Sequence, residues 1–110
     1  MNKKTFYTDL IKFENINGKL DKLSLLDKEK LHLITIIHTS IQTVVIDLVL
    51  SHLKEEDKTT FLKHYSKNKH QLIWNFLYTK IENPKGEILK SINVQLDKFE
   101  KDIDRLLKNI

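Results

Sequence analysis

The chain has 110 residues and a formal net charge of +4, and its residues are 40% hydrophobic and 31% charged. This length fits one domain, and a chain with only two glycines and one proline is typical of a helix-rich globular protein rather than a disordered one. Because the chain contains no cysteine, disulfide frameworks, thiolate metal sites and cysteine nucleophiles are excluded.

The first predicted element is a short helix over residues 3–15, where apolar side chains recur at helical spacing. Gly18 follows in a position typical of the residue that ends a helix. We expect residues 1–23 to form this helix and its connection to a bundle core formed by residues 24–110. The basic start of the chain lacks the uninterrupted apolar run of a signal peptide, which indicates a cytoplasmic protein.

The central apolar segment is LHLITIIHTSIQTVVIDLVL, residues 31–50. Eight of its 20 residues are His, Thr, Ser, Gln or Asp, which argues against a membrane span, and the segment is too long for a strand. On a helical wheel one face is apolar and threonines lie opposite, so we predict a core helix over residues 27–53, capped by Ser24 or Asp27. The core face comprises Leu33, Ile34, Ile37, Ile41, Val44, Val45 and Leu48.

Two shorter helices are predicted next, over residues 55–65 and 69–81. The first begins with acidic and ends with basic residues, which suits the helix dipole at both ends. The second places Trp74 and Tyr78 one turn apart. The segment Glu-Asn-Pro-Lys-Gly at residues 82–86 is the clearest break in the chain.

The last predicted element is a long amphipathic helix over residues 87–109. Its apolar residues alternate spacings of three and four, as in a heptad seam. The seam either closes the chain's own bundle or pairs with another helix. It comprises Leu89, Ile92, Leu96, Phe99, Ile103, Leu106 and Ile110.

These elements predict an all-α fold, a single small bundle of four to five helices. The two long amphipathic members, residues 27–53 and 87–109, are expected to pack antiparallel around the aromatic helix at residues 69–81. There is no internal repeat or linker, so we expect one domain over residues 1–110.

The order of these segments resembles that in a group of short, uncharacterised helical proteins of reduced-genome bacteria of the candidate phyla, which carry a domain of unknown function. The resemblance covers about residues 20–107. It is carried by LDKLSLLDKEKLHLI, the long apolar helix, SHLKEEDKTTFL, IWNFLYTKI and the charged heptad helix. It implies a helical fold and assigns no activity, ligand or catalytic residue.

No residue pattern predicts catalysis or metal binding. The five histidines are never four apart on one helix and lack nearby partners to complete a metal site. Asp47 has no histidine on its face of the helix to act with it as a general base pair. We therefore expect a non-enzymatic protein with no cofactor, metal, membrane association or small-molecule substrate, and no cavity furnished for chemistry.

Contact with a protein partner or with a second copy of the chain is the favoured interpretation, as in an adaptor, inhibitor or immunity-type protein. Apolar residues outside the main helix faces are the candidates for this contact, because a helix that is apolar on several sides is covered on several sides. They are Ile36, Ile46, Leu50, Val94 and Leu107.

Weak, sequence-nonspecific binding of nucleic acid is the alternative interpretation. Residues 58–81 combine lysines and aromatic side chains without Asp or Glu, and such a segment can neutralise phosphates and stack on exposed bases. All but one of the 19 basic residues of the chain are lysine, which favours a solvated surface over specific recognition. The candidate residues are Lys58, Lys63, Lys67, Lys69, Lys80, Tyr65 and Tyr78.

Overall fold

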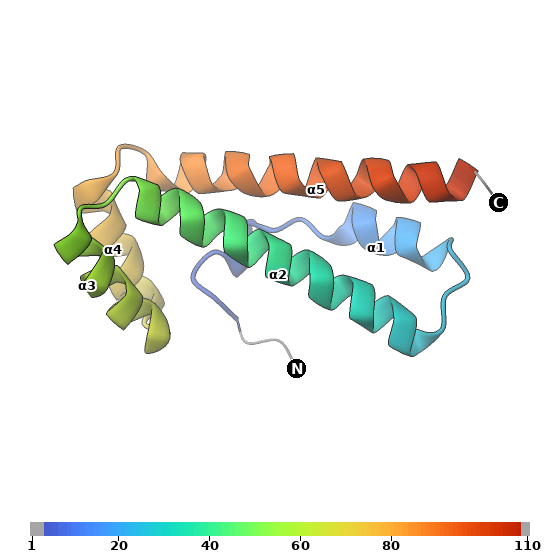
Figure 1. Cartoon of the computed structure of the whole chain (residues 1–110), viewed down its shortest axis with the longest axis horizontal. Helices are drawn as coiled ribbons and strands as arrows, with labels where there is room; N and C mark the ends of the chain where they lie inside the picture. Colours follow the sequence, from blue (N-terminus) through green and yellow to red (C-terminus); the bar gives the residue numbers. More distant parts are fainter. Residues whose placement is uncertain (1–3, 109–110) are drawn as a thin grey trace.

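The computed structural model describes residues 4–108, which form one 3₁₀ turn and five α-helices without a strand (Figure 1). The predicted all-α bundle with two long helices is therefore confirmed, and the long helices are α2 and α5. The 3₁₀ turn η1 is Thr8–Leu10, and the helices are α1 (Glu14–Asp21), α2 (Asp27–Ser51), α3 (Glu55–Ser66), α4 (His70–Lys80) and α5 (Pro84–Lys108).

The two long helices α2 and α5 run antiparallel and pack against each other, and α1 packs against α5 (Figure 1). α3 and α4 pack against each other at the end where α2 stops and α5 starts. The aromatic helix α4 thus lies at one end, not between the long helices as the sequence predicts. The molecule measures 50 × 25 × 20 Å, and its radius of gyration of 15.9 Å exceeds the value of about 13 Å typical of a compact domain of this length.

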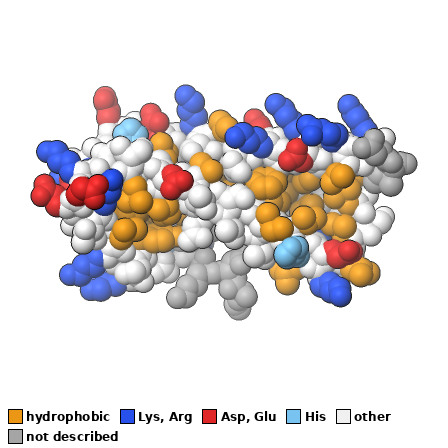
Figure 2. Space-filling model, viewed as in Figure 1, with side chains coloured by type: hydrophobic (Ala, Val, Ile, Leu, Met, Phe, Trp, Pro, Cys, Tyr) orange, Lys and Arg blue, Asp and Glu red, His pale blue; other side chains and the backbone are white. Residues whose placement is uncertain are grey.

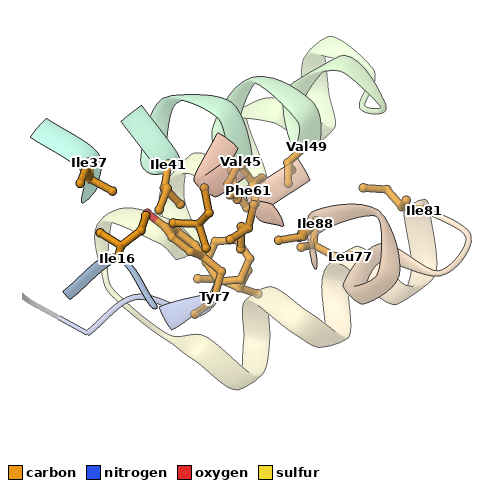
Figure 3. Packing of buried hydrophobic residues seen from close by; sticks show 14 of the residues in the cluster. Tyr7, Ile16, Ile37, Ile41, Val45, Val49, Phe61, Leu77, Ile81 and Ile88 are labelled. Atoms are coloured by element: carbon orange, nitrogen blue, oxygen red, sulfur yellow. The ribbon is translucent and has the colours of Figure 1, made fainter. Parts of the chain in front are cut away.

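The core is one cluster of apolar side chains from all five helices and from the N-terminal segment (Figure 3). Phe61 of α3 is fully buried within it, as are Val45 and Val49 of α2. Among residues 4–108 no polar or charged residue is buried, so the interior is held by apolar packing. Other large, fully buried side chains are Ile16, Leu20, Ile41, Ile73, Leu77, Ile88 and Ile92.

The prediction of a helix over residues 3–15 is wrong. This segment contains the short turn η1, and α1 begins at Glu14, near the end of the predicted helix. Gly18, predicted to end a helix, lies inside α1 with ordinary right-handed backbone geometry. The apolar residues do recur at helical spacing, but the segment that carries them is irregular and lies against the bundle.

Tertiary contacts of Phe6 explain why the segment is not helical. The indole nitrogen of Trp74 donates a hydrogen bond of 3.0 Å to the backbone carbonyl of Phe6, which in an α-helix would accept from the amide of Leu10. The Leu10 amide instead donates to the carbonyl of Tyr7 at 2.9 Å. The Phe6 ring is buried, with its centroid 5.2 Å from that of Trp74 and 6.1 Å from that of Tyr65. Burial of this ring outweighs the local preference for helix.

The start of α2 lies at Asp27 as predicted, but its cap differs. The N-cap residue is Leu26, whose amide donates to the carboxylate of Glu29 at 2.9 Å. Ser24, predicted as a cap, instead adopts a left-handed φ of 56° in the preceding turn. The Glu29 carboxylate therefore satisfies an amide at the helix start, as the acidic member of a capping box does.

The buried stripe of α5 departs from the predicted heptad seam toward its end. Leu106, predicted in the seam, is 57% exposed, and Leu107 packs against the core instead. A straight helix has 3.6 residues per turn and drifts by about 20° per heptad, so over two heptads the inward position moves by part of a residue step. Ile110 lies outside the described residues. The buried members of α5 are Pro84, Ile88, Ile92, Leu96 and Ile103.

Truncation of Phe61 tests the core assignment. Phe61→Ala is expected to lower the free energy of unfolding by about 3 to 5 kcal/mol, because it leaves a large cavity in a closed interior. Its neighbour Leu62 is 44% exposed, so Leu62→Ala is expected to cost less than about 1 kcal/mol. Urea unfolding followed by circular dichroism measures both, and equal losses would contradict this core.

Substitution of the two glycines tests the corrected N-terminal region. Gly18→Ala is expected to stabilise the protein by about 0.5 to 1 kcal/mol, because an added Cβ meets nothing within 4 Å and alanine favours helix. A glycine that ends a helix in the left-handed region would give the opposite sign. Gly86→Ala is the control and is expected to destabilise, because its Cβ would overlap the side chain of Asn83. Thermal unfolding reports both changes.

Candidate functional site

A half-open cavity of about 430 Å³, which we call the polar cavity, lies between the N-terminal segment, the middle of α2 and the end of α3. The sequence indicates nothing about this cavity, since the prediction made from it concerned only a cavity furnished for chemistry. Its walls carry hydroxyl and amide groups, and no carboxylate is among the described residues that line it. Six of the polar residues that line it are Thr5, Tyr7, Thr35, Thr39, Gln42 and Tyr65.

A chain of polar side chains connects the three walls. Gln42 of α2 donates its side-chain amide to the hydroxyl of Tyr65 on α3 at 2.8 Å. The hydroxyl of Tyr7 interacts with those of Tyr65 and Thr5, and the Thr5 hydroxyl lies 2.9 Å from that of Thr8. Burial, followed by the charge of Tyr65, raises the pKa of Tyr7 to about 12. The Tyr7 phenol therefore remains protonated at neutral pH.

The basic groups at the cavity contribute little net charge. His38 stacks on Phe13, with ring centroids 4.8 Å apart and planes 3° from parallel. Burial lowers the pKa of His38 below its usual value of 6.5, so its imidazole is neutral at pH 7. The ammonium of Lys4 lies 3.2 Å from a carboxylate oxygen of Asp9. The cavity is accordingly close to electrically neutral.

Binding suits this cavity better than catalysis. A nucleophile needs an adjacent base, and the one imidazole here stacks on a phenyl ring with no carboxylate on the cavity wall to orient it. Asp47 lies exposed on α2, away from the cavity lining. Within residues 4–108 there is no group of three His, Asp or Glu side chains that could hold a metal ion.

A second candidate site is an apolar patch at the start of α2, which we call the α2 patch: Leu25, Leu26, Leu33 and Ile36. Leu26 is 62% exposed and Ile36 is 41% exposed. A groove of about 450 Å³ lies here, with Leu25 and Leu33 in its wall beside Lys28, Glu29 and His32. Figure 2 shows apolar side chains gathered on this half of the molecule, with charged groups at their edge.

α2 is long and apolar enough to cross a membrane, judged by length and composition alone. Its most apolar 18-residue window has a mean hydropathy of 1.9, and 22% of that window is buried in the structure. The buried residues of α2 are Ile37, Ile41, Val45 and Val49, and its exposed large apolar side chains are Leu31 and Ile36.

The predicted partner-binding residues fall into two groups. Ile36 and Val94 are exposed, Val94 at 50%. Ile46, Leu50 and Leu107 are half-buried and pack against the core. Two further exposed apolar side chains, Leu26 and Leu31, each 62% exposed, were not among the residues predicted from the sequence.

The basic segment at residues 58–81 is partly occupied by internal contacts. The ammonium of Lys58 lies 2.9 Å from a carboxylate oxygen of Glu55, and that of Lys80 lies 3.5 Å from one of Asp57. Tyr65 is half-buried and accepts the hydrogen bond from Gln42. The exposed candidates are Lys63, Lys67, Lys69, Tyr78 and the ion-paired Lys80.

Comparison of the chain with protein-family models, with curated proteins and with solved structures gave no match. The resemblance to the candidate-phyla proteins therefore stays a prediction. The functional proposals below rest on the surfaces of this molecule alone.

Alkaline titration tests the buried tyrosine of the cavity. The pKa of Tyr7 is raised from 10.0 to about 12, so its contribution to stability is complete below pH 10 and is lost as the pH rises through 12. Tyr7→Phe is expected to remove the late phenol from an ultraviolet titration and to flatten this loss. Tyr78→Phe, at an exposed tyrosine, is expected to keep the late phenol. Loss of the late phenol in Tyr78→Phe would contradict the assignment.

Proposed function

We propose that this chain is a non-enzymatic protein-interaction module, of the adaptor, inhibitor or immunity type, that binds a partner through the α2 patch. The carrying observation is that large apolar side chains of this patch stand in water: Leu26 is 62% exposed and Ile36 is 41% exposed. Apolar area left in water is costly, and covering it with a partner stabilises the complex by roughly 25 cal/mol for each Å² removed from water.

The surroundings of the α2 patch favour a protein partner over a lipid bilayer. Lys28 and Glu29 stand together at the groove, so its rim carries both signs of charge, as protein interfaces commonly do. Thr35 and Thr39 follow along α2, and Asp47 is exposed farther on. These groups would lie in hydrocarbon if α2 spanned a bilayer, where a carboxylate costs roughly 2.5 to 3.5 kcal/mol.

The nucleic-acid alternative draws less support from the contacts of its residues. Lys58 and Lys80 are paired with carboxylates, which reduces the positive potential that would attract phosphates. Tyr65 stacks against Phe61 with ring centroids 5.9 Å apart. One of the two tyrosines proposed to stack on bases is therefore already stacked inside the protein. Binding of nucleic acid is one of the outcomes that the capture experiment distinguishes.

Capture of the tagged protein from a host lysate, with and without nuclease and at low and raised salt, tests the proposal. We expect a defined protein partner that resists both treatments. Ile36→Glu is expected to reduce its capture by about tenfold or more, because it places a charge in the contact. Leu62→Glu is the matched control, since Leu62 is 44% exposed on α3 against 41% for Ile36, and is expected to capture normally.

Two results would count against this function. Recovery that disappears with nuclease or raised salt would support the nucleic-acid alternative. Equal capture by Ile36→Glu and Leu62→Glu would place the contact elsewhere on the molecule.

A further inference from the structure

We infer that the cavity between the N-terminal segment, α2 and α3 binds a small, uncharged, hydroxyl-rich molecule of the size of a monosaccharide or cyclic polyol. This inference does not depend on the protein-interaction proposal, which uses the α2 patch. The cavity is built from residues that lie far apart in the sequence, within 4–11, 35–42 and 65–68, so the fold itself brings them together.

The dimensions of the cavity fit a small ligand. Its volume of about 430 Å³ lies within the range of roughly 300 to 1,000 Å³ of pockets that hold small molecules. Ile11 and the rings of Tyr7 and Tyr65 provide apolar wall against which the carbon skeleton of a polyol can pack. A larger macromolecule would have contact with the rim only.

The absence of unbalanced charge selects an uncharged ligand. No carboxylate is found among the described lining residues, and the one ammonium, that of Lys4, has the Asp9 carboxylate 3.2 Å away. A charged ligand would lose its hydration without gaining an opposite charge, which is unfavourable by several kcal/mol in a partly closed site. An uncharged polar ligand loses far less.

The walls offer donors and acceptors together, which is what a hydroxyl-rich ligand requires. The Thr35 hydroxyl donates to the carbonyl of Leu31 at 2.9 Å, so its oxygen remains an acceptor. Gln42 uses one amide hydrogen on Tyr65, which leaves a second hydrogen and a carbonyl oxygen. A hydroxyl group both donates and accepts, and it can therefore pair with either kind of site.

The rigidity of one wall supports a preformed site. The Tyr7 side chain is buried, Tyr65 accepts a hydrogen bond from Gln42, and the amide and hydroxyl of Thr5 both contact the hydroxyl of Thr8. Side chains held by such a network lose little conformational entropy when a ligand binds, which favours affinity for small polar molecules.

The test uses the full chain and named probes. Glucose, N-acetylglucosamine and myo-inositol are titrated into the ¹⁵N-labelled protein, with glucose 6-phosphate, glucosamine and inorganic phosphate as charged counterparts. We expect at least one uncharged probe to give saturable shifts at the amides of Thr35, Thr39 and Gln42, and the charged probes to bind about tenfold or more weakly. No saturable shift from any uncharged probe at millimolar concentration, or tighter binding of a charged one, would overturn the inference.

Matched tryptophan substitutions locate the site. Thr39→Trp fills the cavity and is expected to weaken probe binding by about tenfold or more, or roughly 1.4 kcal/mol. Thr43→Trp is the control, because Thr43 is also exposed on α2 one turn farther on and is not a lining residue. It is expected to bind within about twofold of the unaltered chain. Equal loss in both variants would overturn the assignment.

A second, smaller substitution keeps the inference testable if Thr39→Trp does not fold. Gln42→Leu keeps a helix-forming side chain of similar size at an exposed position and removes the amide that contacts Tyr65. We expect an unchanged circular dichroism spectrum and weaker probe binding. Unchanged probe binding in Gln42→Leu would contradict the role given to this wall. Gln42 is not within three or four residues of a member of the α2 patch, so partner capture by Gln42→Leu serves as an independent readout of the other proposal.

Discussion

Anchoring of the N-terminal segment at Phe6 is the contact on which the rest of this structure depends. The Phe6 ring sits among the aromatic side chains of α3 and α4, and the indole of Trp74 holds its backbone carbonyl at 3.0 Å. This contact places Tyr7 beside Tyr65 and lays the segment across α2, which closes one side of the polar cavity. Without it, the residues before α1 would have no reason to lie near α3, and the cavity would lose a wall.

The helices from residue 27 onward were predictable because their signals are local. Apolar periodicity located α2 and its buried residues Ile37, Ile41 and Val45, although it missed the buried Val49, and the break at residues 82–86 separates α4 from α5. Pro84 shows the limit of this reasoning, since it opens α5 instead of preceding it, as proline commonly does in a first helical turn. The N-terminal segment was mispredicted because its spacing fits a helix equally well, whereas the contact that decides its shape is made by Trp74, 68 residues away.

The two candidate sites differ in how much of each could be predicted from the sequence. Ile36 of the α2 patch was identifiable as an apolar residue off the core face, whereas the exposure of Leu26 depends on the packing of α1 and α5. No pattern in the sequence indicated the polar cavity. Thr35, Thr39 and Gln42 have the pattern of a solvated helix face, and nothing in the sequence indicates that Tyr7 and Tyr65 would stand opposite them. Sites assembled from distant segments require the tertiary fold.

The pairing of Phe6 with Trp74 also has a consequence for biosynthesis. The ribosome makes roughly 5 to 20 residues per second, so the nascent chain carries Phe6 for about 3 to 14 s before its partner, 68 residues later, has been added. Until Trp74 has been added this phenyl ring lacks its partner on α4, and the apolar surface of α2 still lacks α5, which packs against it. Phe6 is thus synthesised well before it can reach its native place, and chaperones that bind apolar segments have their best opportunity in this window.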